Sequence, residues 1–284
     1  MRAEQHTDPV AYHAEGPCWA EAWPRGESGL RWVDMLAGDV LSLRPDGSIE
    51  RRHVGDVAAV VRPRVGGGAV IGVERGIALE DADGGLDTLP QLWSSSAVRM
   101  NEGGCDPQGR FYCGSMAYDQ AKGAARLYRL DADGEIEVVL DGVTISNGID
   151  WSPDGSLAYY DDTETGEVAV FDHDPERGLT GRRVLVDVGD DAPDGLTVAG
   201  DGSIWVALAA GGAVHGYSPD GTLQEVVEVD ATKVTACTFG GSALDRLYIT
   251  TSQEDVDLAE DPLAGSLFVC EPGITGQPTR PYAG

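Results

Sequence analysis

Four polar residues, each at the start of an apolar strand-like run, recur along the chain at nearly constant spacing: Glu15, Asn101, Asn147 and Asp194. Asn101 and Asn147 are 46 residues apart, Asn147 and Asp194 are 47 apart, and the 86 residues from Glu15 to Asn101 are close to two such steps. Carboxylate and carboxamide oxygens are the ligands that hard divalent cations prefer. If the fold brings these side chains to one point, the sequence predicts a metal site.

A repeat of 40–50 residues that is built of strands is typical of a β-propeller, in which each repeat forms one blade. Turn signals alternate here with short runs of branched and aromatic residues, and two hairpin turns per repeat imply four strands per blade. The turn signals lie at 45–47, 107–109, 133–134, 153–155, 201–202 and 219–221. The expected fold class is therefore all-β, with four-stranded antiparallel blades around a central channel.

The number of blades follows from the starts of the first strands. These starts are Glu15, Val61, Asn101, Asn147, Asp194 and Ala236. Six starts predict a single six-bladed β-propeller domain over residues 1–284. The last strand-like run, 266–270, would pair with N-terminal strands and close the ring, which leaves no long unpaired edge. In such a ring the first strand of every blade lines the same channel, so residues far apart in sequence meet there.

Asn147-Gly148 and Asp194-Gly195 have a second interpretation, because Asn-Gly and Asp-Gly are the strongest hairpin-turn dipeptides. Each is followed, however, by a short apolar run and then by another turn signal, at 153–155 and 201–202. The later signal can serve the hairpin, which places the earlier dipeptide at a strand entrance. There glycine allows a positive φ or a close approach of the backbone. On the sequence alone both interpretations stay open.

The composition bounds the partners and the compartment. The net charge of −28, with Lys122 and Lys233 as the only lysines, repels phosphate backbones and anionic lipids, so we expect no nucleic acid and no membrane partner. The acidity is typical of a solvated surface, including one suited to high salt. Five cysteines without a CxxC pair indicate a reducing compartment, although Cys105 and Cys113 could pair across a hairpin. Residues 1–14 carry no apolar signal-like run, so we expect a cytoplasmic protein.

Three further expectations concern the surroundings of the polar repeat. Arg99 and Glu102 form a solvated pair in one interpretation, whereas in the other Arg99 holds a substrate oxygen through its fork of donors. His13 shows no zinc-binding spacing with other histidines, and we expect it at the surface. Residues 252–264 are expected to form a solvated acidic loop.

Five segments, in this order and spacing, resemble the gluconolactonase/regucalcin family, whose members are also called senescence marker protein-like lactonases. The segments are EGPCW at 15–19, RMNEGGCDPQGRFYCGSM at 99–116, SNGIDWSPDG at 146–155, PDGLTV at 193–198 and VTACTFGG at 234–241. The resemblance covers nearly the whole chain. It implies a six-bladed propeller with one divalent cation at the channel mouth, calcium first, with zinc, manganese or magnesium as alternatives.

The resemblance also implies roles for the residues that match its motifs. Glu15, Asn147 and Asp194 would be the metal ligands. Asn101 would lie beside the metal and touch the substrate or a bound water. Arg99 would bind substrate oxygens.

Asp119 matches the family more loosely and falls near an acid that contacts substrate. The chain departs from the usual family pattern at Cys18, Glu102 and Ser146. These positions lie next to the site, so they bear on the identity of the substrate more than on metal binding.

The resulting hypothesis is a metal-dependent lactonase that opens a lactone ring, with a sugar lactone as its small-molecule partner. A bound cation would polarise the lactone carbonyl and lower the pKa of bound water, and Asp194 would act as the general base. The protein would be a monomer or a small homo-oligomer. Two alternatives stay open: a non-catalytic metal-binding propeller scaffold, and an esterase or phosphotriesterase that uses the same site.

Overall fold

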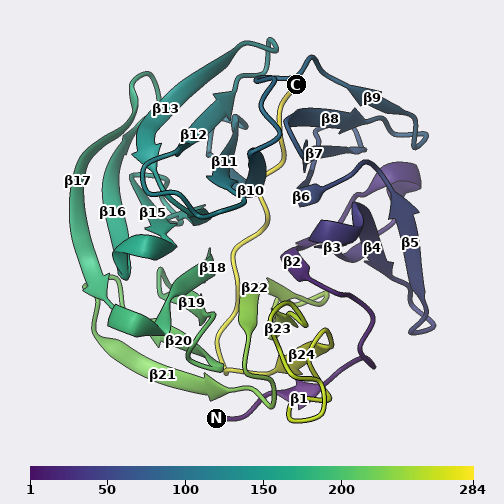
Figure 1. Ribbon diagram of the computed structural model, residues 1–284, viewed down its shortest axis with the longest axis vertical. Helices are drawn as coiled ribbons and strands as arrows, with labels where there is room; N and C mark the ends of the chain where they lie inside the picture. The colour runs from purple at the N-terminus through teal and green to yellow at the C-terminus, as the bar shows by residue number, and fades with distance from the viewer.

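Six four-stranded antiparallel sheets are arranged as a ring in the computed structural model, which describes residues 1–284 apart from the side chain of Arg25 (Figure 1). This is the six-bladed β-propeller that the repeat predicts. Blade 1 consists of β2 (Ala14–Ala20), β3 (Gly29–Asp34), β4 (Asp39–Leu43) and β5 (Ile49–His53). Blade 2 consists of β6 (Ala58–Pro63), β7 (Ala69–Val73), β8 (Gly76–Glu80) and β9 (Leu86–Thr88). Blade 3 consists of β10 (Val98–Cys105), β11 (Phe111–Ala117), β12 (Ala125–Leu130) and β13 (Ile136–Val143).

The second half of the ring repeats this order from the channel outward. Blade 4 consists of β14 (Ser146–Trp151), β15 (Leu157–Asp162), β16 (Glu167–Asp174) and β17 (Gly178–Asp187). Blade 5 consists of β18 (Pro193–Val198), β19 (Ile204–Leu208), β20 (Ala213–Tyr217) and β21 (Leu223–Glu228). Blade 6 consists of β22 (Val234–Gly240), β23 (Arg246–Thr251), β24 (Leu267–Cys270) and the N-terminal β1 (Glu4–Gln5). Each predicted strand start falls within an inner strand, although β6 and β10 each begin three residues before the predicted starts, Val61 and Asn101.

Ring closure is confirmed in the predicted form. Glu4 of β1 pairs with Val269 of β24, and Gln5 pairs with Phe268, in an antiparallel ladder. The two ends of the chain therefore complete one blade together. Four 3₁₀ turns accompany the strands: η1 (Pro24–Gly26), η2 (Met35–Ala37), η3 (Thr163–Thr165) and η4 (Gly189–Asp191). Among the described residues, no helix has the length and apolar character that crossing a bilayer requires.

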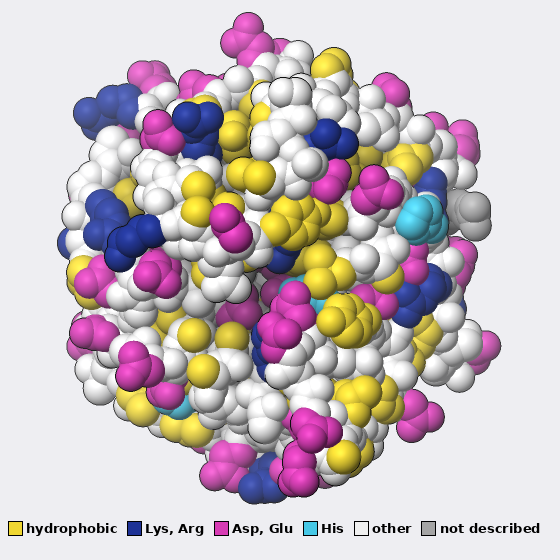
Figure 2. All heavy atoms as spheres, in the orientation of Figure 1, with side chains coloured by type: hydrophobic (Ala, Val, Ile, Leu, Met, Phe, Trp, Pro, Cys, Tyr) yellow, Lys and Arg dark blue, Asp and Glu magenta, His cyan; other side chains and the backbone are white. Residues whose placement is uncertain are grey.

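Many of the acidic residues serve as turn caps. In eleven turns and loops of the described chain an aspartate Oδ1 accepts a hydrogen bond from the backbone N–H two residues later: Asp46, Asp81, Asp106, Asp119, Asp133, Asp154, Asp174, Asp187, Asp201, Asp220 and Asp257. An aspartate favours these turns because its short side chain bonds the local backbone. Figure 2 shows acidic side chains spread over this face of the ring. The acidity thus follows in part from the number of hairpins.

The acidic loop at 252–264 is less solvated than we expected. Asp261 is only 6% exposed, and its carboxylate accepts hydrogen bonds from the backbone N–H and the hydroxyl of Thr232. Ser252 is fully buried. The expectation of a solvated loop is wrong for these positions, because the loop packs against the entrance of β22.

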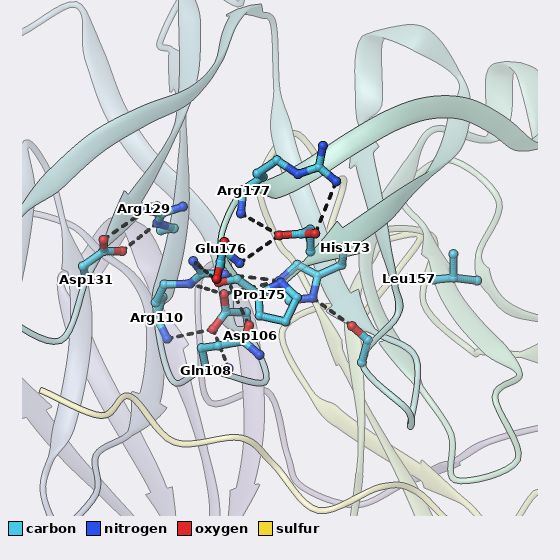
Figure 3. Close-up of polar contacts among 12 residues, drawn as sticks. Asp106, Gln108, Arg110, Arg129, Asp131, Leu157, His173, Pro175, Glu176 and Arg177 are labelled. Carbon is cyan, nitrogen blue, oxygen red and sulfur yellow. Dashed lines mark hydrogen bonds and ion pairs between the residues drawn. The ribbon is translucent and has the colours of Figure 1, made fainter.

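A buried polar cluster joins blades 3 and 4 on the side away from the N-terminal ends of the inner strands (Figure 3). Arg110 lies between Asp106 and His173. Its Nε donates to Asp106 Oδ2 at 2.5 Å, and its Nη2 lies 3.3 Å from His173 Nε2. His173 Nδ1 lies 2.8 Å from the carbonyl oxygen of Gly155, which can only accept, so Nδ1 carries the proton and Nε2 accepts from Arg110.

The last eleven residues cross the ring and form what we call the C-terminal strap, residues 274–284 (Figure 1, yellow). The strap makes hydrogen bonds to every blade, through Trp19, Pro63, Gly109, Trp151, Gly200 and Leu244. These partners lie at the far ends of the inner strands or in the turns that follow them. The strap therefore closes the channel at that end. Between it and the polar repeat lies a polar cavity of about 60 Å³.

Candidate functional site

The four polar residues of the repeat lie on β-bulges near the entrances of four inner strands. The register with the second strand shifts between Glu15 and Cys18, between Met100 and Gly103, between Ser146 and Ile149, and between Pro193 and Leu196. A bulge turns a side chain out of the regular alternation, and bulges are common beside active sites. The hairpin-turn interpretation of Asn147-Gly148 and Asp194-Gly195 is therefore wrong.

Close approach explains the two glycines in these bulges. A Cβ on Gly148 would lie 2.5 Å from the backbone nitrogen of Leu196, and one on Gly195 would lie 2.3 Å from the Cβ of Ala236. Any larger residue would push neighbouring inner strands apart. The glycines thus allow the ring to be narrow where the polar side chains meet.

A chain of hydrogen bonds links three blades at the site. Asn101 Nδ2 donates to the carbonyl oxygen of Ser146 at 2.8 Å and lies 3.4 Å from Asn147 Oδ1. Asn147 Nδ2 donates to Thr163 Oγ1 at 2.8 Å, and that hydroxyl donates to the carbonyl oxygen of Pro193 at 2.8 Å. The backbone beside Asp194 is therefore tied to Asn101, two blades away.

Two acids face this chain in a water-poor environment. Glu15 is 2% exposed and Asp194 is 7% exposed. Burial, followed by the charges of Asp194 and Glu102, raises the pKa of Glu15 well above its usual range. Burial and the charge of Glu102 do the same for the pKa of Asp194. Oδ1 of Asp194 is buried without a hydrogen-bond partner among the described residues.

These observations suit a cation. Two buried carboxylates that repel each other, one of them with an orphaned oxygen, are stabilised by a positive charge between them. With the Asn147 amide oxygen they make an all-oxygen donor set, the kind that calcium takes. The described residues contain no cluster of three His, Cys, Asp or Glu side chains arranged as a metal site. The predicted set has only two such residues, because its third member is an amide.

Arg99 lies beside the acids and is held on one side only. Its Nη1 donates to Asn101 Oδ1 at 2.6 Å and to the carbonyl oxygen of Met100 at 3.0 Å, and it lies 2.9 Å from Met35 Sδ. Its Nε and Nη2 make no hydrogen bond within the described residues. They leave two parallel donors for an oxygen-rich ligand.

The solvated Arg99–Glu102 pair is not present. Glu102 is 2% exposed, and its Oε1 accepts a hydrogen bond from Arg62 Nη2 at 2.8 Å. Arg62 comes from the inner strand of blade 2, so the pairing crosses between blades. Glu102 thus faces the cavity above the C-terminal strap, whereas Arg99 faces the channel mouth.

Asp119 is not brought into the cluster. Its side chain is exposed, and Oδ1 accepts a hydrogen bond from the backbone N–H of Ala121. It lies in the connection that follows β11, at the same end of the ring as the site. Its predicted contact with substrate stays a prediction.

Other residues at the site were missed by sequence reasoning. His13 is 6% exposed, not at the surface, and its Nδ1 lies 2.6 Å from Ser252 Oγ. Burial lowers the pKa of His13 to about 4, so the ring is neutral. Lys233 Nζ donates to Glu254 Oε2 at 2.9 Å, and the charge of Lys233 acts on Asp194. Lysine is rare in this chain, and that rarity is the sequence feature that could have drawn attention to Lys233.

A further acid stands behind the site between blades 4 and 5. Asp161 is fully buried, and neither of its carboxylate oxygens has a hydrogen-bond partner among the described residues. Its strand neighbour Tyr159 packs with Leu196 and Val198 of β18, and Asp161 points to the same side because strand residues alternate. Burial and the charge of Asp194 raise the pKa of Asp161 well above its usual range.

The surface view shows how a ligand reaches this cluster. Figure 2 shows a hollow at the centre of the ring with acidic side chains inside it and large apolar side chains along its border.

All five cysteines are free thiols, so Cys105 and Cys113 do not pair. In register, Cys113 stands opposite Gly103 and Cys105 opposite Phe111.

Known proteins resemble this chain over most of its length. The sequence profile described as SMP-30/Gluconolactonase/LRE-like region matches residues 13–253. Pentonolactonase XacC of Haloferax volcanii is 34% identical over 275 residues, which cover 93% of this chain and 92% of that protein. Regucalcin of Danio rerio is 33% identical over 282 residues, covering 95% and 94%. A solved structure of a calcium-binding protein, regucalcin, from Agrobacterium tumefaciens has a TM-score of 0.89 at 24% identity, covering 99% and 96%, and shares the fold.

Proposed function

Because the chain belongs to the SMP-30/gluconolactonase/LRE-like family, we propose that it is a hydrolase that opens sugar lactones. One observation carries the proposal: Glu15 and Asp194 meet Asn101 and Asn147 at the mouth of the channel, and one buried oxygen of Asp194 has no partner. A scaffold protein has no need for unpaired acids in a buried position, because they cost stability.

We propose a divalent cation as the cofactor, held by the Glu15 and Asp194 carboxylates and the Asn147 amide oxygen. When bound, it supplies polarisation of the lactone carbonyl and a lowered pKa for water. The orphaned Asp194 oxygen and the repulsion between the two acids support this assignment. Calcium is the first ion to test, because the donors are all oxygens and a protein of the same fold is described as calcium-binding.

Asp194 is proposed as the general base. Its carboxylate has two oxygens, so one would hold the cation while the other accepts a proton from the water that attacks the lactone carbonyl; Oδ1 is not occupied by any group of the protein. The same carboxyl then returns the proton to the ring oxygen as the acyl–oxygen bond breaks, so the reaction ends with a hydroxy acid. A positioned base of this kind contributes about 10²–10⁴-fold to the rate.

Arg99 is proposed to orient the substrate. Its free Nε and Nη2 donors can bind the hydroxyl or carbonyl oxygens of a sugar lactone, while Asn101 fixes the opposite edge of the guanidinium. Both ends of the Asn101 amide are engaged by the protein, so its contribution runs through Arg99 and Asn147. Asp119 would contact substrate from the connection after β11.

The test is a hydrolysis assay on the purified protein after removal of metal by a chelator. Five- and six-membered sugar lactones, an unsubstituted lactone, an aryl ester and a phosphotriester are offered in turn, and a pH indicator follows acid release. Calcium, zinc, manganese and magnesium are added back one at a time. We expect sugar lactones to be opened fastest, and only with a divalent cation present.

Other outcomes point to the alternatives. Faster turnover of the aryl ester or phosphotriester than of every lactone would move the assignment to an esterase or phosphotriesterase. Cation binding without turnover of any substrate would favour a metal-binding scaffold. A monomeric or small homo-oligomeric state and a cytoplasmic location stay predictions, and light scattering of the purified protein tests the first.

A further inference from the structure

We infer that Tyr118 is a specificity-determining residue whose ring forms one wall of the substrate site, so that lactones with a broad C–H face and hydroxyls along one edge bind best. The inference rests on the proposed function and adds to it a recognition element that the repeat does not contain.

Tyr118 stands at the mouth of the channel because of where β11 ends. Val98, at the entrance of β10, pairs with Ala117, the last residue of β11, and Tyr118 follows directly. Its backbone N–H donates to the carbonyl oxygen of Ala97, which fixes the start of the connection. Tyr118 is therefore placed by the same ladder that places Arg99.

The ring of Tyr118 lies over the guanidinium of Arg99, with 5.9 Å between the ring centroid and Cζ. Arg99 is 5% exposed, whereas Tyr118 is 46% exposed. One part of the ring thus covers the arginine and the other part is open to solvent at the channel mouth. An aromatic ring over a guanidinium is an attractive contact, and it keeps water from one side of the cation.

The ring is also held from a second blade. The Tyr118 hydroxyl donates to Glu74 Oε1 at 3.0 Å, and the carbonyl oxygen of Glu74 accepts a hydrogen bond from the backbone N–H of Met100. Burial together with the Glu74 carboxylate raises the pKa of Tyr118 to about 12, so the phenol stays protonated and keeps donating. A half-exposed aromatic side chain that is tethered at its tip has little freedom to lose when a ligand binds.

These contacts define the ligand by its chemistry. A flat apolar ring beside two free arginine donors suits a molecule with C–H groups on one face and oxygens along an edge. A sugar lactone has both features. A small unsubstituted lactone offers little of either, so it should gain little from Tyr118.

The test compares Tyr118→Ala and Tyr118→Phe with the wild-type protein on a six-membered sugar lactone and on γ-butyrolactone. Leu223→Ala is the matched control, since Leu223 is also 46% exposed but lies on β21 at the outer edge of blade 5. For Tyr118→Ala we expect KM for the sugar lactone to rise about three- to tenfold with kcat changed less than about twofold. On γ-butyrolactone, kcat/KM should change less than about twofold. Tyr118→Phe keeps the ring and should stay closer to wild type than Tyr118→Ala.

Three results would overturn the inference. These are an unchanged KM for the sugar lactone in Tyr118→Ala, an equal loss on both lactones, and a Tyr118→Phe variant as impaired as Tyr118→Ala. Each requires an active wild-type protein, so each leaves the proposed function standing. A wild-type protein that hydrolyses no lactone with any of the four cations would overturn the proposed function, and this inference with it.

Discussion

The side-chain nitrogen of Asn101 lies 3.4 Å from the side-chain oxygen of Asn147, although the two residues are 46 positions apart in the chain. They occupy equivalent bulges in neighbouring blades, so the blade repeat explains both their spacing in the sequence and their contact. Equivalent residues of successive blades lie together at the channel mouth. A substitution at any one of these positions should therefore act on the shared site rather than on one blade.

Replacing Asp194 with alanine should abolish lactone hydrolysis and cation binding together. The change removes the orphaned carboxylate oxygen, and with it both the general base and one of two acidic ligands. We expect kcat to fall by about 10²–10⁴-fold or more. Calorimetric titration with calcium measures binding, and the pH-indicator assay measures turnover.

Asp190→Ala is the control for this change, because Asp190 is an exposed acid four residues away in η4. It alters the net charge equally and should leave both readouts unchanged. A variant at Asp194 that still turned over lactone would remove Asp194 from the role of base.

Asp161 should make the protein less stable as the pH rises. Its pKa in the folded protein is raised by burial and by Asp194, so the folded state binds the proton more tightly than the unfolded chain. The stability from this group is complete below the usual carboxyl pKa and is lost as the pH rises through the raised value. Asp161→Asn should therefore be more stable than wild type at pH 8, by about 1–3 kcal/mol, and similar to it near pH 4.

Urea unfolding at several pH values measures this difference. Asp162→Asn is the neighbouring control: its carboxylate accepts backbone hydrogen bonds from Thr144 and Ile145, so its loss should destabilise by about 1 kcal/mol. If Asp161→Asn were less stable than wild type at pH 8, the ionised Asp161 carboxylate would stabilise the folded protein, which contradicts the prediction.

The sequence was sufficient to predict the ring of blades and the clustering of its polar residues, because both follow from the repeat spacing. The spacing of Asn101, Asn147 and Asp194 predicts blades, and a closed ring then brings the residues together. The bulges were harder to predict, since Asn-Gly and Asp-Gly serve hairpin turns equally well. Only the later turn signals argued against that use.

Contacts that do not follow the blade repeat could not be predicted from the sequence. Glu102 pairs with Arg62 of the neighbouring blade, and nothing in the spacing of the two residues indicates it. The C-terminal strap has no strand pattern, because its hydrogen bonds go to a different blade at almost every residue. His13 looked like a surface residue because the loop that buries it lies more than 200 residues away, at Ser252.

Removing Arg110 should destabilise the junction between blades 3 and 4. Burial alone would raise the pKa of Asp106, but hydrogen bonds from the backbone N–H and the guanidinium of Arg110, together with the charge of that guanidinium, outweigh it and hold that pKa below its usual range. Arg110→Ala leaves a fully buried carboxylate without its cation, a change that typically costs about 3–5 kcal/mol. Chemical unfolding at pH 7 measures it.

Two further variants sharpen this test. Arg183→Ala breaks an ion pair with Asp172 in which both side chains are about half exposed, and it should cost about 0.5 kcal/mol or less. Adding Asp106→Asn to Arg110→Ala should recover part of the loss, since the uncompensated charge is gone. Equal costs for the Arg110 and Arg183 variants would show that burial of the cluster does not matter.

Truncating Tyr282 should show how strongly the C-terminal strap is bound. The ring is 2% exposed and packs in the core shared by blades 1, 2 and 3, and its hydroxyl donates to the carbonyl oxygen of Asp131 at 2.8 Å. Tyr282→Ala should cost about 3–5 kcal/mol, as large aromatic truncations in cores do, whereas Tyr282→Phe loses only the hydrogen bond and should cost about 1 kcal/mol. Tyr12→Ala, at a tyrosine that is 48% exposed, should change stability by about 0.5 kcal/mol or less. Because the C-terminal strap makes hydrogen bonds to all six blades, the stability lost in Tyr282→Ala should appear as one cooperative shift of the unfolding curve. A separate early transition would instead mean that the strap detaches while the ring stays folded.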